Sequence, residues 1–202
     1  MQNISRSSFV VAGLFGCTLL AGLQAQAQGA TYAIDPQHSQ VEFGIKHMGI
    51  STVHGRFALA AGTINLDEKN VAGSSVMATI NVTSVDTGEA ARDKHLNSPD
   101  FFDTAKFPTA TFQSTRIVKA GDAYDVVGNL TLHGVTKPVT LHMEAPSKEQ
   151  IGMDKLPHRG FSAMTTIHRQ DFGLTWNGTL SSGDSMLGDD VKMNFDIEAA
   201  RK

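Results

Sequence analysis

Apolar and polar residues alternate along most of the chain after residue 30, and this period of two restricts the possible folds more than any other feature. Val41, Phe43 and Ile45 alternate with Glu42, Gly44 and Lys46, and similar patterns cover residues 76–83 and 191–197. Successive side chains of a strand point to opposite faces of a sheet, so this alternation predicts strands with one face buried. The sequence therefore indicates an all-β protein.

The chain's 202 residues suit a single domain, and we find no internal repeat. About eight or nine long strands with polar turns between them fit an antiparallel barrel or sandwich. A barrel is favoured because eight strands closed into one sheet leave an interior that can hold one small ligand. Pro138 cannot donate to a strand ladder and predicts an edge or a bulge, while Asn177-Gly178 predicts a turn. Residues 124–132 and 135–143 are expected to form a hairpin around His133-Gly134, and residues 50–60 and 64–66 are expected to be successive strand segments.

One stretch interrupts the β pattern. Residues 87–98 are predicted to form a short helical insertion, because good helix formers precede Ser98-Pro99, where the residue before proline avoids the helical region. Charged side chains from this turn and the apolar residues that follow it make a candidate ligand site. The members are Arg92, Asp93, His95, Leu96, Phe101, Phe102, Phe107 and Phe112. The alternative is a helix whose charges only interact with one another and with solvent.

The first 27 residues have the features of a secretory signal peptide. Arg6 provides a positive charge, residues 9–23 are apolar, and Ala25-Gln26-Ala27 is a small-x-small cleavage site. We expect cleavage after Ala27 and a mature domain over residues 28–202. A lipoprotein anchor at Cys17 is the alternative, but Phe15 is bulky where a small residue is expected and the apolar run continues past the cysteine.

Charge and motif content exclude several classes of function. The chain carries a net charge of −3, which becomes −4 when Arg6 leaves, so no basic surface is expected for nucleic acid or for an anionic membrane. The eight histidines have no zinc-binding spacing, and we expect no metal and no cofactor. No nucleophile elbow or glycine-rich phosphate loop is present, and stable membrane insertion is not expected.

Motifs distributed over the whole mature chain are similar to those of the YceI-like family of exported lipid-binding proteins. They occur in the same order as in that family, which makes the resemblance specific. The matching segments include residues 32–43, 84–96, 100–103, 107–114, 128–136, 169–176 and 188–191.

This resemblance implies a lipocalin-like barrel in the periplasm that holds a long polyisoprenoid, such as an isoprenoid quinone or a prenyl phosphate, and that carries no catalytic residues. It also makes a homodimer an expectation. In that barrel Arg92, Asp93 and His95 would lie at one end, where they meet the headgroup or fix the helix over the mouth. The remaining residues expected to contact the ligand are Phe43, Ile45, Leu96, Phe101, Phe102, Phe107, Phe112, Leu130, Leu132, Phe161, Ile167, Trp176 and Phe195.

Two other functions stay open from the sequence. A lipid-modifying enzyme would use His95 and Asp93 as an acid–base pair, which requires the two side chains to act on one substrate atom. An interaction module without a ligand would use the strand edge near Pro138 and would have a fully packed interior.

Overall fold

The computed structural model describes residues 29–202, so the predicted signal peptide, its cleavage site and Cys17 lie outside the described residues. Strands make up more than half of the described chain, which also has one α-helix and two short 3-10 helices. The strands are β1 (Ala30–Ile34), β2 (Gln40–His47), β3 (Ser51–Leu66), β4 (Ser75–Asp86), β5 (Thr109–Ala120), β6 (Ala123–Leu132), β7 (Val135–Met143), β8 (Gln150–Ile151), β9 (Pro157–His168) and β10 (Leu187–Arg201). The helices are η1 (Val71–Gly73), α1 (Ala90–Asn97) and η2 (Arg169–Phe172).

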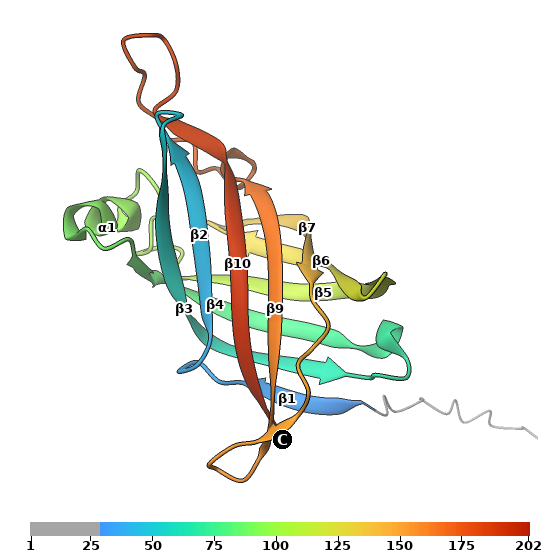
Figure 1. Cartoon of the computed structure of the whole chain (residues 1–202). Helices are drawn as coiled ribbons and strands as arrows, with labels where there is room; N and C mark the ends of the chain where they lie inside the picture. The colour runs from blue at the N-terminus through green and yellow to red at the C-terminus, as the bar shows by residue number, and fades with distance from the viewer. Residues whose placement is uncertain (1–28) are drawn as a thin grey trace, which may run out of the picture.

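Eight of the strands form a closed antiparallel ring. The order is β2-β3-β4-β5-β6-β7-β9-β10, and the ring closes where β10 pairs with β2. β1 adds to β10 and β3 at one end, and β8 adds to β9. Figure 1 shows β2, β10 and β9 side by side in front, crossing β4, β5 and β6 behind them. The all-β barrel with a short helical insertion that the sequence predicts is therefore confirmed.

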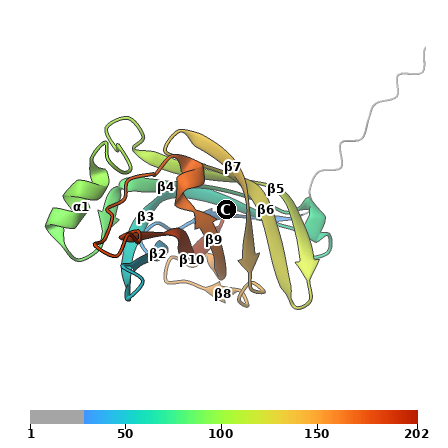
Figure 2. The ribbon, with the colours of Figure 1, turned by 90° about the horizontal axis from the view of Figure 1, so that it is seen from above.

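The predicted alternation places apolar side chains inside this ring. In β2, Val41 and Phe43 are buried while Glu42 between them is exposed. The buried side chains of the ring form one continuous apolar core. α1 projects from the side of the barrel at one end, as both views show (Figure 1 and Figure 2).

β3 is longer than the sequence suggests. The segments 50–60 and 64–66, which look separate in the sequence, belong to one strand whose pairing with β4 shifts register twice. The first shift follows Gly55, where a Cβ atom would lie 2.4 Å from the ring of Phe43. Glycine is therefore required there, because only a residue without a side chain lets the ring lie across the backbone.

Two turn predictions have different outcomes. His133 and Gly134 both have positive φ values, 51° and 74°, which is the two-residue turn that suits the twist of a hairpin. The predicted turn at Asn177-Gly178 is wrong. The Asn177 amide instead bonds both backbone groups of Leu187, so this segment runs extended beside the start of β10.

β7 pairs with β6 along its whole length but with β9 only at His142 and Met143. Pro138 lies on the part of β7 that has no partner on the β9 side, which confirms the predicted edge.

Among residues 29–202, no helix combines the length and the apolar character needed to span a bilayer.

Candidate functional site

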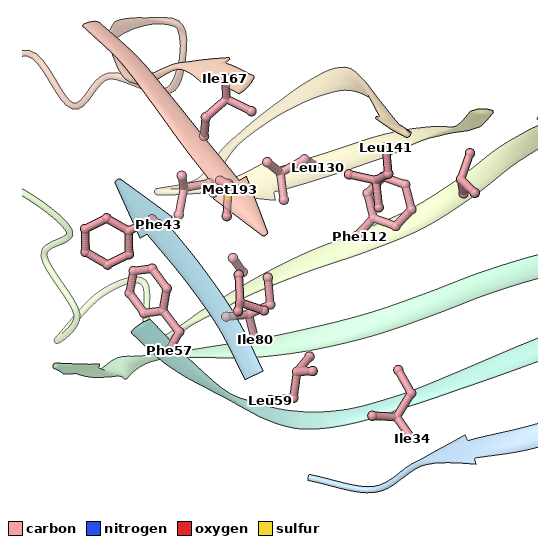
Figure 3. Packing of buried hydrophobic residues seen from close by; sticks show 14 of the residues in the cluster. Ile34, Phe43, Phe57, Leu59, Ile80, Phe112, Leu130, Leu141, Ile167 and Met193 are labelled. Atoms are coloured by element: carbon pink, nitrogen blue, oxygen red, sulfur yellow. The ribbon is translucent and has the colours of Figure 1, made fainter. Parts of the chain in front are cut away.

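The barrel contains an apolar cavity at the end where α1 lies. This upper cavity has a volume of about 290 Å³ and is enclosed by residues from the ring strands, from α1 and from the connection between β9 and β10. Figure 3 shows Phe43, Phe57, Leu130 and Ile167 gathering from four different strands into this space. Its volume is near the lower limit of small-molecule sites.

Most of the residues that the sequence assigns to ligand contact do line the upper cavity. They are Phe43, Ile45, Arg92, His95, Leu96, Phe101, Phe102, Leu130, Leu132, Ile167 and Trp176. The lining also includes residues that the sequence analysis missed, which come from the ring strands, from the loop before α1 and from the β9–β10 connection. They are His47, Val53, Phe57, Ile80, Val82, Thr87, Ala110, Arg169, Leu174, Met186, Leu187, Val191 and Met193.

Three predicted residues lie deeper in the barrel. Phe112, Phe161 and Phe195 line a second, lower cavity of about 60 Å³. Ile80 lines both cavities. The interior is therefore divided into two spaces at the level of Ile80, where the sequence suggested one tube.

Phe107 lies outside both cavities. Its ring packs against His133 with a centroid separation of 4.8 Å, beneath the β6–β7 turn. A Cβ atom on Gly134 would come within 2.7 Å of the same ring. Phe107 therefore fixes a turn next to the cavity instead of lining it.

The insertion is attached to the barrel by aromatic contacts. The rings of His95, Phe101 and Trp176 lie within 5.1 Å of one another, measured between centroids. Phe102 meets Phe57 edge to face at 5.5 Å. Each such pair adds roughly 0.5–1.5 kcal/mol to the burial of the rings, so the insertion is held across this end of the barrel.

Local hydrogen bonds set the start of α1. Glu89 caps the helix by accepting from the Ala91 amide at 3.2 Å. Asp93 Oδ1 accepts from the amide of Thr87, and also from its hydroxyl, while Arg92 donates to the hydroxyl and the carbonyl oxygen of Thr87. Asp93 thus fixes the loop before α1 and does not line the cavity.

His95 and Asp93 have different partners. His95 Nε2 lies 3.0 Å from Asp100 Oδ2, and both side chains are substantially exposed. Asp93 bonds Thr87 instead. The acid–base pair that a lipid-modifying enzyme would need is not assembled.

Arg169 is the most unusual residue of the lining. Its side chain is only 3% exposed at the end of β9, and it donates to the carbonyl oxygens of Leu174, Trp176 and Gly188. Burial lowers the pKa of its guanidinium from the ordinary value, and nearby Asp189 opposes this effect. The period of two could have predicted its inward position, because Arg169 comes two residues after the inward-facing Ile167, directly past the end of β9.

A family comparison agrees with this geometry. A model of the YceI-like domain matches residues 32–199. The chain belongs to the YceI-like family. Among curated relatives of this domain, Protein YceI of Escherichia coli O157:H7 is 48% identical over 154 residues, which cover 73% of this chain and 78% of the relative.

Solved structures have the same YceI-like barrel. BcnA of Burkholderia cenocepacia superimposes with a TM-score of 0.70 at 27% identity, covering 82% of this chain and 98% of BcnA. A polyisoprenoid binding domain from Saccharophagus degradans matches with a TM-score of 0.60 at 17% identity, covering 86% of this chain and 99% of that domain. At that identity the second likeness concerns the fold alone.

The other end of the YceI-like barrel carries a polar cluster. His38 Nδ1 lies 2.8 Å from Asp35 Oδ2, and His158 bonds both Glu198 and Asp154. Ligand atoms of Asp35, His38 and Glu198 lie within 4.8 Å of one another, so this group could hold a metal ion. The His38–Asp35 and His158–Glu198 ion pairs already account for the geometry of this group, and the cluster lies far along the strands from the upper cavity.

Proposed function

We propose that this YceI-like protein binds a polyisoprenoid, or an apolar lipid of similar length, in the upper cavity and carries it in the periplasm. The apolar upper cavity is the observation on which this proposal rests. Each Å² of lipid removed from water there contributes roughly 25 cal/mol, so a tail binds without many specific contacts. The polyisoprenoid binding domain with the same fold supports the ligand class.

The alternatives have less support. A ligand-free interaction module requires a packed interior, and a cavity of about 290 Å³ does not fit that requirement. Lipid modification by His95 and Asp93 requires a pair that the hydrogen bonds separate.

Filling the cavity tests the proposal. Ala110 is buried and lines the upper cavity, whereas Thr111, the next residue of β5, is exposed. We expect Ala110→Trp to weaken binding of a C20 isoprenoid alcohol by about tenfold or more, because the indole occupies the space of the tail. Thr111→Trp is the matched control and should bind as the wild type does. Isothermal titration gives both affinities, and circular dichroism checks that each variant is folded. Equal binding by the two variants would contradict the proposal.

Native mass spectrometry identifies the natural ligand and the location. Protein recovered from its own periplasm should begin at Gln28 and release a lipid with an isoprenoid mass ladder. The same spectrum tests the expected homodimer. A protein that retains its first 27 residues, or one that neither co-purifies with a lipid nor takes one up, would contradict the carrier role.

A further inference from the structure

Arg169 has hydrogen-bonding capacity that the described chain does not use. Its Nε atom donates to Gly188 and its Nη1 atom donates to Leu174 and Trp176. Its Nη2 atom is buried, yet it has no hydrogen-bond partner among residues 29–202. Leaving a charged donor buried without a partner costs more free energy than leaving a neutral one. These three bonds, from two of the three guanidinium nitrogens, hold the side chain in place, and the third nitrogen, Nη2, is left without a partner.

The charge of Arg169 also lacks a direct counter-charge in the described part of the chain. All three of its bonded partners are neutral carbonyl oxygens. The carboxylate of Asp189 is near enough to affect its pKa, but it accepts from the Gln170 amide and faces His168. Buried charges in proteins are normally paired, so a site for an anion remains open here.

The side chains that line the upper cavity and can carry a charge are all basic. Of the 24 described residues that line it, none is acidic. The groups that can carry charge are Arg92, Arg169, His47 and His95. Arg92 is exposed and is held by Thr87, whereas Arg169 is enclosed. The apolar cavity therefore has a basic lining that would attract a negative group and repel a positive one.

We propose that Arg169 binds the oxyanion headgroup of the lipid, with its Nη2 atom donating to a phosphate or carboxylate oxygen while the tail fills the upper cavity. This inference rests on the proposed lipid binding and adds the chemistry of the headgroup. A hydrogen bond between two ionised groups is about twice as strong as a neutral one, and enclosure strengthens it further. A phosphate and a carboxylate share this chemistry, and the experiment separates them.

Three ligands with the same C20 chain test the inference: geranylgeranyl phosphate, geranylgeranoic acid and geranylgeraniol. We expect the wild type to bind at least one of the two anions about tenfold tighter than the alcohol or more. The tighter of the two anions identifies the headgroup. Equal affinity for all three would overturn the inference and leave the proposed lipid binding intact. Failure to bind any of them would instead count against the proposed function.

A variant assigns the preference to one residue. Arg169→Met should lose the preference for anions while its affinity for geranylgeraniol changes less than about threefold, because the tail contacts remain. Arg116→Met is the matched control, since Arg116 is exposed on β5 and lines neither the upper nor the lower cavity. A preference that survives in Arg169→Met, or that falls equally in Arg116→Met, would overturn the assignment.

Salt dependence tests the wild type without any substitution, in case Arg169→Met does not fold. Attraction to an exposed cation such as Arg92 weakens strongly between about 0.05 and 0.5 M salt, because the Debye length falls below 10 Å. A bond to enclosed Arg169 is screened much less. We expect the anion preference to change less than about threefold over that range. Its disappearance at high salt would overturn the role of Arg169.

Discussion

Two histidines at the end of the barrel opposite α1 form ion pairs whose strength depends on pH. The hydrogen bond that His38 donates to Asp35 raises the pKa of His38, and the bond that His158 donates to Asp154 raises the pKa of His158. The pKa of Asp35 is lowered chiefly by its bond to His38, and the pKa of Asp154 is lowered first by the Leu156 amide and then by His158. The Asp35–His38 pair lies in the turn between β1 and β2, and His158 also bonds Glu198, which joins β9 to β10.

The signs of these shifts define a pH window for stability. A histidine with a raised folded-state pKa stabilises the fold fully below its unfolded pKa of about 6.5, and loses that contribution as pH rises through the folded value. An aspartate with a lowered pKa contributes above about 3.8 and loses its contribution as pH falls through its own folded value. The pairs therefore contribute most between about pH 4 and 6.5.

We predict that the melting temperature falls between pH 6 and pH 8.5, and that replacing His38 and His158 together by Gln removes most of this fall. Differential scanning calorimetry across the pH range measures it. His54→Gln is the control, because exposed His54 forms no ion pair among residues 29–202. An unchanged slope in the double variant would contradict the assignment.

Single residues differ in how well the sequence predicts them. The inward position of Ile167 follows from alternation, and the same reasoning reaches Arg169 two residues later. The partners of Arg169 could not be predicted, because they are carbonyl groups of an irregular segment. The role of Asp93 could not be predicted either, since its bond to Thr87 depends on how the loop before α1 folds back.

At the scale of elements, the junction between β7 and β9 is the weakest part of the ring. Beyond the backbone pairs at His142 and Met143, the hydroxyl of Thr165 donates to the Thr140 carbonyl oxygen at 2.8 Å. A groove on this side is lined by residues of both strands, including Pro138 and Thr166. Side-chain bonding thus replaces part of the missing ladder.

We predict that Thr165→Val destabilises this junction by about 1 kcal/mol, because one partly buried hydrogen bond is lost while the side-chain volume is kept. Hydrogen exchange of the β7 amides should become faster, with little change in β2 and β3. Thr166→Val is the matched control, since Thr166 is exposed and forms no side-chain hydrogen bond among the described residues. Exchange that stays the same in β7 would show that the bond is unimportant.

Strand positions could be predicted well from the sequence, and turn geometry less well. The alternating pattern predicted β2 and the hairpin around His133 correctly, because each depends on residues that are close in sequence. The continuity of β3 was missed because register shifts after Gly55 interrupt the pattern. The turn predicted at Asn177-Gly178 was wrong because the Asn177 amide bonds the backbone of Leu187, ten residues away, and the dipeptide alone does not reveal such a distant partner.

At the scale of the whole molecule, one side chain borders both spaces of the barrel interior. Ile80 is 4% exposed and contributes to both the upper and the lower cavity. Ring closure was predictable from the number and length of the strands, and the helical insertion from the helix formers that precede Ser98-Pro99. The division of the interior was not, because it depends on which buried side chains meet across the barrel.

We predict that Ile80→Ala joins the two cavities. Stability should fall by about 2–5 kcal/mol, the usual cost of this truncation in a core. Affinity should shift from C20 toward longer isoprenoids, because the tail gains a deeper space. Val82→Ala is the matched control, since Val82 lines only the upper cavity of the two. Denaturant unfolding and binding to chains of different length measure both effects. An unchanged length preference in Ile80→Ala would contradict the division.

Closure of the ring by its last strand also affects how the chain folds. β10 pairs with β2, so that Met193 lies opposite Phe43, and it also pairs with β9. Contacts between residues so distant in sequence slow folding, because the intervening chain must be ordered before they form. Until β10 arrives, β2 and β9 each present an unpaired edge, which is a template for aggregation. The newly made protein therefore depends on protection of these two edges until its final strand is in place.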